Sequence, residues 1–321
     1  MIKFAAMEEG KIYDSQVLVM AVAERLTKAG EPFCVFTLSD GTEQVSANRF
    51  KDRAKNVPAT FANNEIFIKK VCNARLECSS YNGNRSFSIK ELTVAQDGSY
   101  QMDDFIMRAP LDSETMYNSI ISGLEKQCKS NIKDIAINIF KQNKDKLLQW
   151  SAASSMHHAY YGGLLYHTFR MLNHAVLMGR VYKNLNMDIL LVGVALHDIG
   201  KLCELETDPL GISEYTVDGN LLGHLICGIE MVTEEAAKYP AKYNAEEVRM
   251  IKHLIASHHG RTEFGAIKPP ATAEAFALWL IDMTDARMEG CEEAYADMKP
   301  GQMSQIPVKG LDARLYVPIL A

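Results

Sequence analysis

The sequence lacks long uncharged hydrophobic runs, and this lack bears on the expected location of the protein in the cell. The first 14 residues carry no apolar stretch long enough for a signal peptide. No later stretch reaches transmembrane length without a charged residue. Lipidation motifs, low-complexity segments and internal repeats are also absent. We therefore expect a cytoplasmic protein with no membrane partner.

Paired cysteines and an excess of basic charge are missing as well. The seven cysteines are scattered and none forms a CxxC pair, which is typical of reduced thiols in a cytosolic protein. The formal net charge of -6 does not favour a general polyanion binder, although it leaves room for a local basic groove. With 47% apolar residues among 321, the chain is long enough for two domains with sizeable cores.

Residues 1–100 alternate apolar and polar side chains in the manner of strands. Asp40-Gly41 is a strong hairpin signal between two of these runs. The runs cover residues 16–22, 33–38, 43–47, 66–71, 75–79 and 86–94. We predict that these six runs form five short strands that close into a small barrel, with a polar insert before the fourth.

The strand pattern, with its block FCVFTLSDGT, resembles the OB-fold. The resemblance implies a module that binds single-stranded nucleic acid by aromatic stacking and a cationic track. Phe33, Phe36 and Lys69 are the candidates for these contacts. The opposing interpretation is that most of the barrel's aromatic side chains are core. Charge does not decide between the two, because residues 1–100 carry 13 basic and 12 acidic side chains.

From Ser113 onward the apolar spacing changes to three and four residues, which predicts helices. We divide the chain into a barrel at 1–100, a connector with helices at 101–150, a helical domain at 151–295 and a tail at 296–321. The predicted fold class is a multidomain α and β protein, with an N-terminal small β-barrel of the OB type and a C-terminal all-α helical bundle.

All nine histidines lie between residues 157 and 259, and none is in the predicted barrel. Random scatter would not favour this distribution, whereas a metal site would. His197 and Asp198 stand side by side where an apolar helical run ends, so two metal-ligand types meet at one helix end. On its own the pair could also be a hydrogen-bonded structural dyad.

Four other segments carry side chains of the same kinds. His167 and His224 each follow glycine near the start of a predicted helix, and His258 and His259 end another. Asp282 lies on a helix among apolar side chains, where a carboxylate needs a cation, a metal or a hydrogen-bond partner. The order along the chain is therefore His, His-Asp, His, His-His and Asp, each on a separate helix.

This order resembles that of the HD-domain metal-dependent phosphohydrolases, in which a helical bundle collects the ligands at its centre. Longer blocks narrow the resemblance to the YhaM-type 3′-5′ exoribonucleases, whose OB-fold precedes their HD domain. The blocks are HHAYYGGLLYHT, ALHDIGK, GHLICG and SHHGRTEFG. Two departures concern substrate handling: Ala266-Ile267 stands where the family tends to have Ser-Pro, and Trp279 where it often has histidine.

The resemblance implies a set of metal ligands. Carried over by position, they are His167, His197, Asp198 and Asp282, with His224 and His258 for a second ion. Asp198 would then bridge the two ions. Ligation by histidine and carboxylate without thiolate suits manganese, with iron, cobalt or zinc as alternatives. We expect up to two ions per chain.

The implied activity is 3′-5′ cleavage of single-stranded RNA, extending to single-stranded DNA, with release of nucleoside monophosphates by metal-activated hydroxide. Asp198 and Lys201 are the candidate catalytic residues, Lys201 placing a positive charge on the phosphate. A solvated lysine at a helix end is an equal interpretation of Lys201. Candidate substrate contacts in the helical domain are His158, His259 and Arg261.

Two other functions stay open at this point. One is an HD-type nucleotide phosphohydrolase, although a mononucleotide enzyme has little need of a strand-binding barrel. The other is a nucleic-acid-binding protein with a non-catalytic HD site, although all the implied ligands are present. The sequence does not determine the preference for RNA or DNA, the native metal, or whether the chain forms a homo-oligomer.

Overall fold

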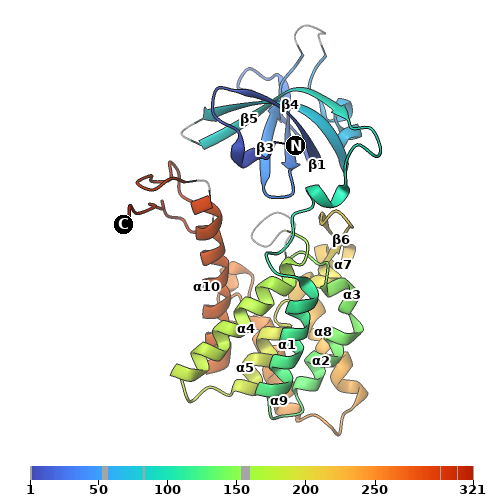
Figure 1. Cartoon of the computed structure of the whole chain (residues 1–321). Helices are drawn as coiled ribbons and strands as arrows, with labels where there is room; N and C mark the ends of the chain where they lie inside the picture. The colour runs from blue at the N-terminus through green and yellow to red at the C-terminus, as the bar shows by residue number, and fades with distance from the viewer. Residues whose placement is uncertain are drawn as a thin grey trace. The chain divides into compact units, whose positions relative to one another are not determined.

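The computed structural model describes residues 2–52, 57–81, 84–152, 160–296, 298–308 and 310–320. The chain divides into two compact units, and Figure 1 shows a β-barrel in one and a bundle of helices in the other. The first comprises Met1–Met107, Asp297–Pro307 and Ala313–Ala321, and the second Arg108–Ala296 and Val308–Asp312. Among the helices described, none is long and apolar enough to cross a membrane.

The first unit is a closed five-stranded barrel with strand order β1-β2-β3-β5-β4. Its strands are β1 (Ile12–Leu26), β2 (Pro32–Ser39), β3 (Gln44–Arg49), β4 (Lys70–Tyr81) and β5 (Asn84–Val94). All pairs are antiparallel except β3 with β5, which closes the barrel in parallel. The predicted small barrel of the OB type is confirmed.

Alternation along the strands builds the barrel core. In β2 the side chains of Cys34, Phe36 and Leu38 are fully buried, while the residues between them are partly exposed. The predicted hairpin at Asp40-Gly41 joins β2 to β3. Gly41 has a φ of 83°, which favours glycine, and a Cβ there would lie 2.1 Å from the Asp104 carbonyl oxygen.

The fourth strand differs from its prediction. Residues 66–71 were expected to be a strand, but Glu65–Phe67 form a 3₁₀ turn and β4 begins at Lys70. Lys69 has a φ of 61°, in the left-handed region, and this interrupts the extended chain just before β4. β4 then runs without a break through 75–79, which the sequence pattern had treated as a separate run.

The second unit is a helical bundle with a short two-stranded sheet, β6 (Leu205–Thr207) and β7 (Ser213–Tyr215). The N-terminal helices are α1 (Ser113–Gln127), α2 (Lys133–Gln142), α3 (Lys144–Leu147), α4 (Gly163–Val181) and α5 (Met187–Leu196). The remaining helices are α6 (Lys201–Glu204), α7 (Val217–Leu221), α8 (Gly223–Lys238), α9 (Ala245–Ser257) and α10 (Ala273–Ala296). The predicted helical bundle is confirmed, but the unit is not all-α, because the paired strands β6 and β7 stand between α6 and α7.

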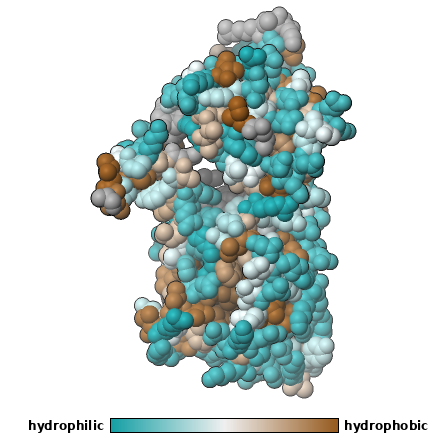
Figure 2. Space-filling view, in the orientation of Figure 1, coloured by the Kyte–Doolittle hydropathy of each residue, from teal (hydrophilic) through white to brown (hydrophobic). Residues whose placement is uncertain are grey.

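Helix α5 forms the centre of the bundle. Its last eight residues, Ile189–Leu196, are all buried, as expected of a helix that is apolar on every side. It packs against α1, α2, α4, α9 and α10, several of which surround it in Figure 1. In Figure 2 the helical unit presents a mostly hydrophilic surface on the visible face, with hydrophobic residues gathered towards the lower end.

Candidate metal centre

Five helices deliver the six predicted ligands to one place. α5 ends at Leu196, so its C-cap His197 and the next residue, Asp198, emerge inside the bundle. α8 starts close beside them because Gly200 has no side chain: a Cβ there would lie 1.9 Å from the His224 carbonyl oxygen. The other ligands are His167 early in α4, His258 at the C-cap of α9 and Asp282 in α10.

Asp198 lies among four imidazoles. Its Oδ2 is 3.3 Å from His197 Nε2 and 3.8 Å from His167 Nε2. Its Oδ1 is 3.5 Å from His224 Nε2 and 3.6 Å from His258 Nε2. Each oxygen of this one buried carboxylate therefore faces a different pair of rings, which is the arrangement that a bridging ligand requires.

The donor atoms form three overlapping groups, each within 4.8 Å: His167, His197 and Asp282; His197, Asp198 and His258; and His224, His258 and His259. Three of these atoms, Asp198 Oδ1, His224 Nε2 and His259 Nδ1, are buried and have no hydrogen-bond partner in the described part of the chain. Such atoms are costly unless an ion or a water completes their contacts. Imidazole and carboxylate donors without thiolate fit a divalent transition metal.

The four imidazoles that face Asp198 are held through their outer nitrogens. The Nδ1 atoms of His197 and His258 bond to the carbonyl oxygens of Val194 and Ile255, and those of His167 and His224 to the carboxylates of Asp285 and Glu204. Because Nδ1–H donates in each bond, the neutral ring keeps its lone pair on Nε2. All four rings therefore turn a potential metal-binding nitrogen towards the centre.

Protonation competes with metal binding at His167. Its Nε2 is 3.3 Å from Asp282 Oδ1. Burial alone would lower the pKa of His167, but the carboxylates of Asp282 and Asp285 outweigh burial and raise it to about 9. Burial would raise the pKa of Asp282, but His167 outweighs this and lowers it to about 2. A cation must displace the Nε2 proton, so binding weakens as pH falls.

Other groups of the centre already have the protonation state that a metal needs. Burial lowers the pKa of His258 to about 4, and Asp198 offsets this only in part. Burial would raise the pKa of Asp198, but Lys201 and His197 hold it well below its usual range. At neutral pH His258 is therefore a neutral ring and Asp198 an ionised carboxylate.

Lys201 belongs to the centre, through a contact that the sequence did not predict. Its Nζ donates a hydrogen bond to Asp198 Oδ2 at 2.7 Å. Burial would lower the pKa of Lys201, but Asp198 outweighs it and raises the pKa. The ammonium therefore stays charged beside the Asp198 carboxylate.

The predicted substrate contacts of the helical unit lie in different surroundings. His259 packs edge-on against His258, with ring centroids 4.3 Å apart, and joins one of the donor groups. Arg261 is at the surface, with 63% of its side chain exposed, and pairs with Glu263 at 3.1 Å. His158 lies outside the described residues.

Trp279, one of the two departures from the family pattern, packs against the end of α9. A Cβ on Gly260 would lie 2.1 Å from Trp279 Cε2, and Gly260 has a φ of 78°. The indole therefore covers the residue that follows the histidine pair. Ala266, the other departure, is buried and donates its N–H to the Arg261 carbonyl oxygen at 3.1 Å.

One predicted barrel contact is wrong. Phe36 is fully buried in the barrel core, so its ring cannot stack on a nucleobase. The strand period puts Phe36 inside and Phe33 outside. Phe33 is partly exposed and stacks on Phe50, with centroids 5.2 Å apart and planes 20° apart. Lys69 is exposed as well, so Phe33 and Lys69 remain available for the predicted contact.

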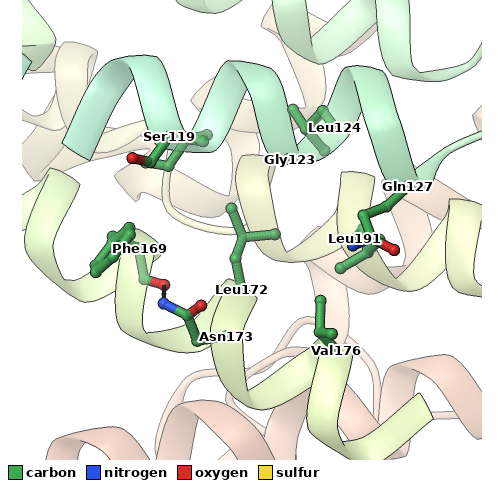
Figure 3. A pocket seen from close by; sticks show the side chains of 10 residues that line it. Ser119, Gly123, Leu124, Gln127, Phe169, Leu172, Asn173, Val176 and Leu191 are labelled. Atoms are coloured by element: carbon green, nitrogen blue, oxygen red, sulfur yellow. Dashed lines mark hydrogen bonds between the residues drawn. The ribbon is translucent and has the colours of Figure 1, made fainter. Parts of the chain in front are cut away.

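An apolar groove in the helical unit is unrelated to the metal centre. It has a volume of about 180 Å³ and lies between α1, α4 and α5, with Phe169, Leu172 and Val176 along one wall (Figure 3). By helical periodicity these three residues lie on the opposite side of α4 from His167. No acid, base or histidine lines the groove, so it offers no groups for hydrolysis.

The sequence did not identify Glu204 and Arg170 as parts of the centre. Glu204 bonds to His224, and Arg170 reaches His167 through Asp285. A weak signal existed for Arg170, since it follows His167 by three residues and so shares its helix face. Glu204 carried no such signal, because its partner lies 20 residues further along the chain.

Comparison with known proteins identifies the class of this protein. The model of the HD domain matches residues 164–287, a range that contains all six predicted ligands. The chain is therefore an HD-domain protein with an OB-like barrel before that domain. It is also 33% identical, over 300 residues, to the 3′-5′ exoribonuclease YhaM of Bacillus subtilis (strain 168), covering 93% of this chain and 92% of that protein. The chain belongs to the YhaM family, and the predicted class of HD-type metal-dependent hydrolases is confirmed.

Proposed function

We propose that the protein is a metal-dependent 3′-5′ exoribonuclease, which shortens single-stranded RNA and also single-stranded DNA, and releases nucleoside monophosphates in the cytoplasm. The observation that carries this proposal is the cluster of four histidines around Asp198, with buried donor atoms that lack partners in the described chain. Near full-length similarity to an exoribonuclease supports the choice of substrate.

We assign the six ligands to two divalent ions, with manganese as the expected metal. One ion would be held by His167, His197, Asp198 and Asp282, and the other by Asp198, His224 and His258, with His259 beside it. Such ions, when bound, act as Lewis acids towards water and the phosphodiester and lower the pKa of water at neutral pH. The orientation of the rings supports this assignment, since each of the four keeps its Nε2 directed inward.

The chain's own residues would position and neutralise the substrate. Lys201 keeps its charge next to Asp198, where it can offset negative charge that develops on the phosphate. Arg261 is exposed and free to reach a backbone phosphate after leaving Glu263. In the barrel, the Phe33 ring and the Lys69 ammonium would hold bases and phosphates further from the 3′ end. The division of labour follows the proposed domains, a strand-binding barrel at 1–100 and a hydrolase at 151–295.

An end-label assay tests the proposal. Single-stranded RNA labelled at its 5′ end is incubated with manganese and wild type, Asp198→Ala or Asp198→Asn, and with Glu235→Gln as a variant of a buried acid outside the centre. We expect wild type and Glu235→Gln to shorten the RNA from its 3′ end, and both Asp198 variants to leave it intact. RNA labelled at the 3′ end should release labelled mononucleotide first.

Two other results would assign a different function. Tight RNA binding without cleavage under any divalent metal would indicate a nucleic-acid-binding protein with an inactive HD site. Hydrolysis of free nucleotides but not of RNA would indicate a nucleotide phosphohydrolase. A protein that takes up no metal after refilling would remove the basis of the site itself.

A further inference from the structure

The four imidazoles around Asp198 are held in two different ways. His197 and His258 stand at helix ends, and each bonds to a backbone carbonyl three residues earlier. Free carbonyl oxygens are present at the last turn of any helix, so this support needs no particular side chain. His167 and His224 instead depend on carboxylates from other elements. Only these two rings therefore have supports that a side-chain substitution can remove.

The support of His167 is a buried chain of charged groups. Asp285 is fully buried in α10 and accepts a hydrogen bond from His167 Nδ1 at 2.8 Å. Its other oxygen accepts from Arg170 Nε at 2.7 Å. Arg170 also donates to Glu289 at 2.5 Å, and Glu289 accepts from the Tyr160 hydroxyl at 3.1 Å. Held from both sides, the Asp285 carboxylate cannot rotate away from the imidazole.

This chain joins the two helices that supply ligands to one end of the centre. On α4, Arg170 follows the ligand His167 by three residues, and on α10 Asp285 follows the ligand Asp282 by three. Ligand and support thus share a face on each helix. The bonds cross between the helices, so they hold His167 Nε2 and Asp282 Oδ1 at 3.3 Å.

The support of His224 is separate and lies at the other end of the centre. Glu204 Oε1 accepts from both the backbone N–H of His224, at 3.1 Å, and its Nδ1, at 3.0 Å. The Glu204 backbone is fixed in turn, because its carbonyl oxygen accepts the Thr216 N–H at 3.0 Å and a Cβ on Gly219 would lie 2.1 Å from it. One oxygen therefore sets both the position and the orientation of this ring.

We propose that Asp285 and Glu204 are positioning residues that each set the affinity of one ion and leave the other unchanged. Asp285, held by Arg170, orients His167, and Glu204 orients His224. The first ion would be held on the side of His167, His197 and Asp282, and the second on the side of His224 and His258, with His259 beside it. This inference rests on the two-ion site of the proposed function, and it divides that site into halves with independent supports.

The expected size of each effect follows from what the carboxylate does for the ring. A charged acceptor on Nδ1 fixes the tautomer and makes Nε2 a better donor to a metal, and losing such a partner typically weakens binding by about 10- to 100-fold. Asp285→Asn and Glu204→Gln keep an acceptor oxygen of similar shape but remove the charge. Each substitution is expected to weaken the binding of one ion by that factor, and to change the affinity of the other ion by less than about threefold.

The test is a manganese titration of the full chain, followed by the electron paramagnetic resonance signal of free Mn²⁺. Wild type should show two bound ions, and each variant should lose affinity in one step of the isotherm. The same substitutions are then placed in a His224→Ala background. There Asp285→Asn should still weaken the remaining ion by about 10- to 100-fold, whereas Glu204→Gln should have no further effect because its ring is gone.

Glu235→Gln is the matched control. Glu235 is a buried carboxylate of α8, the helix that carries His224, and accepts from Asn138, Gln142 and Lys238 without touching a histidine. It should leave both steps unchanged.

Three results would overturn the inference while the proposed function stands: two ions bind, but each substitution weakens both equally; neither substitution changes affinity; or Glu204→Gln still acts in the His224→Ala background. A wild-type protein that binds no manganese would overturn the proposed function and this inference together.

Discussion

The barrel and the helical unit both bury carboxylates, but they use them differently. In the barrel, Asp40 is fully buried and its two oxygens accept the backbone N–H groups of Phe4, Thr42 and Glu43. In the helical unit, Asp198 is almost as buried, yet its Oδ1 has no hydrogen-bond partner in the described chain. Burial of a carboxylate by itself therefore does not mark a site, whereas the buried Oδ1 of Asp198 among four imidazoles needs a further explanation.

The difference predicts that metal removal affects the two units unequally. Dialysis against a chelator should lower the rate of RNA hydrolysis by at least about 10³-fold, because the ions stabilise the charge of the reaction. Binding of single-stranded RNA, measured by fluorescence anisotropy, should change by less than about threefold, since the barrel contacts need no metal. Added manganese should restore hydrolysis. If binding disappeared with the metal, the helical unit and not the barrel would supply the affinity.

Within the barrel, substitution of the inward-facing Phe36 should affect the stability of the fold, and substitution of the outward-facing Phe33 should affect RNA binding. Phe36→Ala removes a fully buried ring and should lower the free energy of unfolding by about 3–5 kcal/mol. Phe33→Ala removes a partly exposed ring and should cost less than about 1.5 kcal/mol, while weakening RNA binding by roughly tenfold. Urea denaturation and anisotropy measure the two effects. Unchanged RNA binding in Phe33→Ala would leave the barrel without its aromatic contact.

In the helical unit, Lys201→Gln should lower kcat by roughly 10²-fold, because it removes the positive charge beside Asp198 that we propose faces the reacting phosphate. Metal content, measured by elemental analysis, should stay at the wild-type value. Lys238→Gln is the matched control, since Lys238 makes the same kind of 2.7 Å pair, three residues away, with Glu235. An equal loss in both variants would show that the effect is general to lysines paired with a buried carboxylate.

Two glycines with the same backbone conformation compare the packing of the units. Gly98 of the barrel and Gly260 of the helical unit have φ values of 83° and 78°. Gly98→Ala should lower the free energy of unfolding by about 1–2 kcal/mol, the usual penalty of an alanine in the left-handed region. No further penalty is expected, because nothing lies within 4 Å of the new Cβ. Gly260→Ala should cost about 1 kcal/mol more, because Trp279 has to move. Thermal denaturation of both variants checks the order.

The smallest expected effect is a pH-dependent one at Glu235. Burial would raise the pKa of Glu235, but its bonds to Lys238, Gln142 and Asn138 outweigh burial and lower the pKa. A carboxyl group whose pKa is lower in the folded state stabilises the fold at pH values above its unfolded pKa of about 4.3. This stabilisation is lost as the pH falls through the folded-state pKa. Glu235→Gln should therefore cost about 1 kcal/mol at pH 7 and less at pH 3, as measured by urea denaturation. A cost that grew as pH fell would contradict the sign of the shift.

The two units also differed in how well their residues could be predicted. The turn at Asp40-Gly41 is local, and it was identified from neighbouring residues. The start of β4 was missed because Lys69 adopts a left-handed φ that its residue type does not favour. Phe36 was misassigned because the alternation along a strand distinguishes two faces but does not say which one faces the core.

The sequence alone determined the order of the two units, since helix ends, period and residue type are short-range properties. The residues gathered around Asp198 followed from the resemblance of the chain's histidine and aspartate blocks to a known family. The sequence could not determine which groups touch, because contacts such as Glu204 with His224 and Asp285 with His167 join segments 20 and 118 residues apart. Those contacts exist only once Gly200 and Gly228 let α6 and α8 meet and α4 packs on α10. Tertiary packing thus decided how each ring is aimed, because an imidazole's orientation depends on the partner of its outer nitrogen.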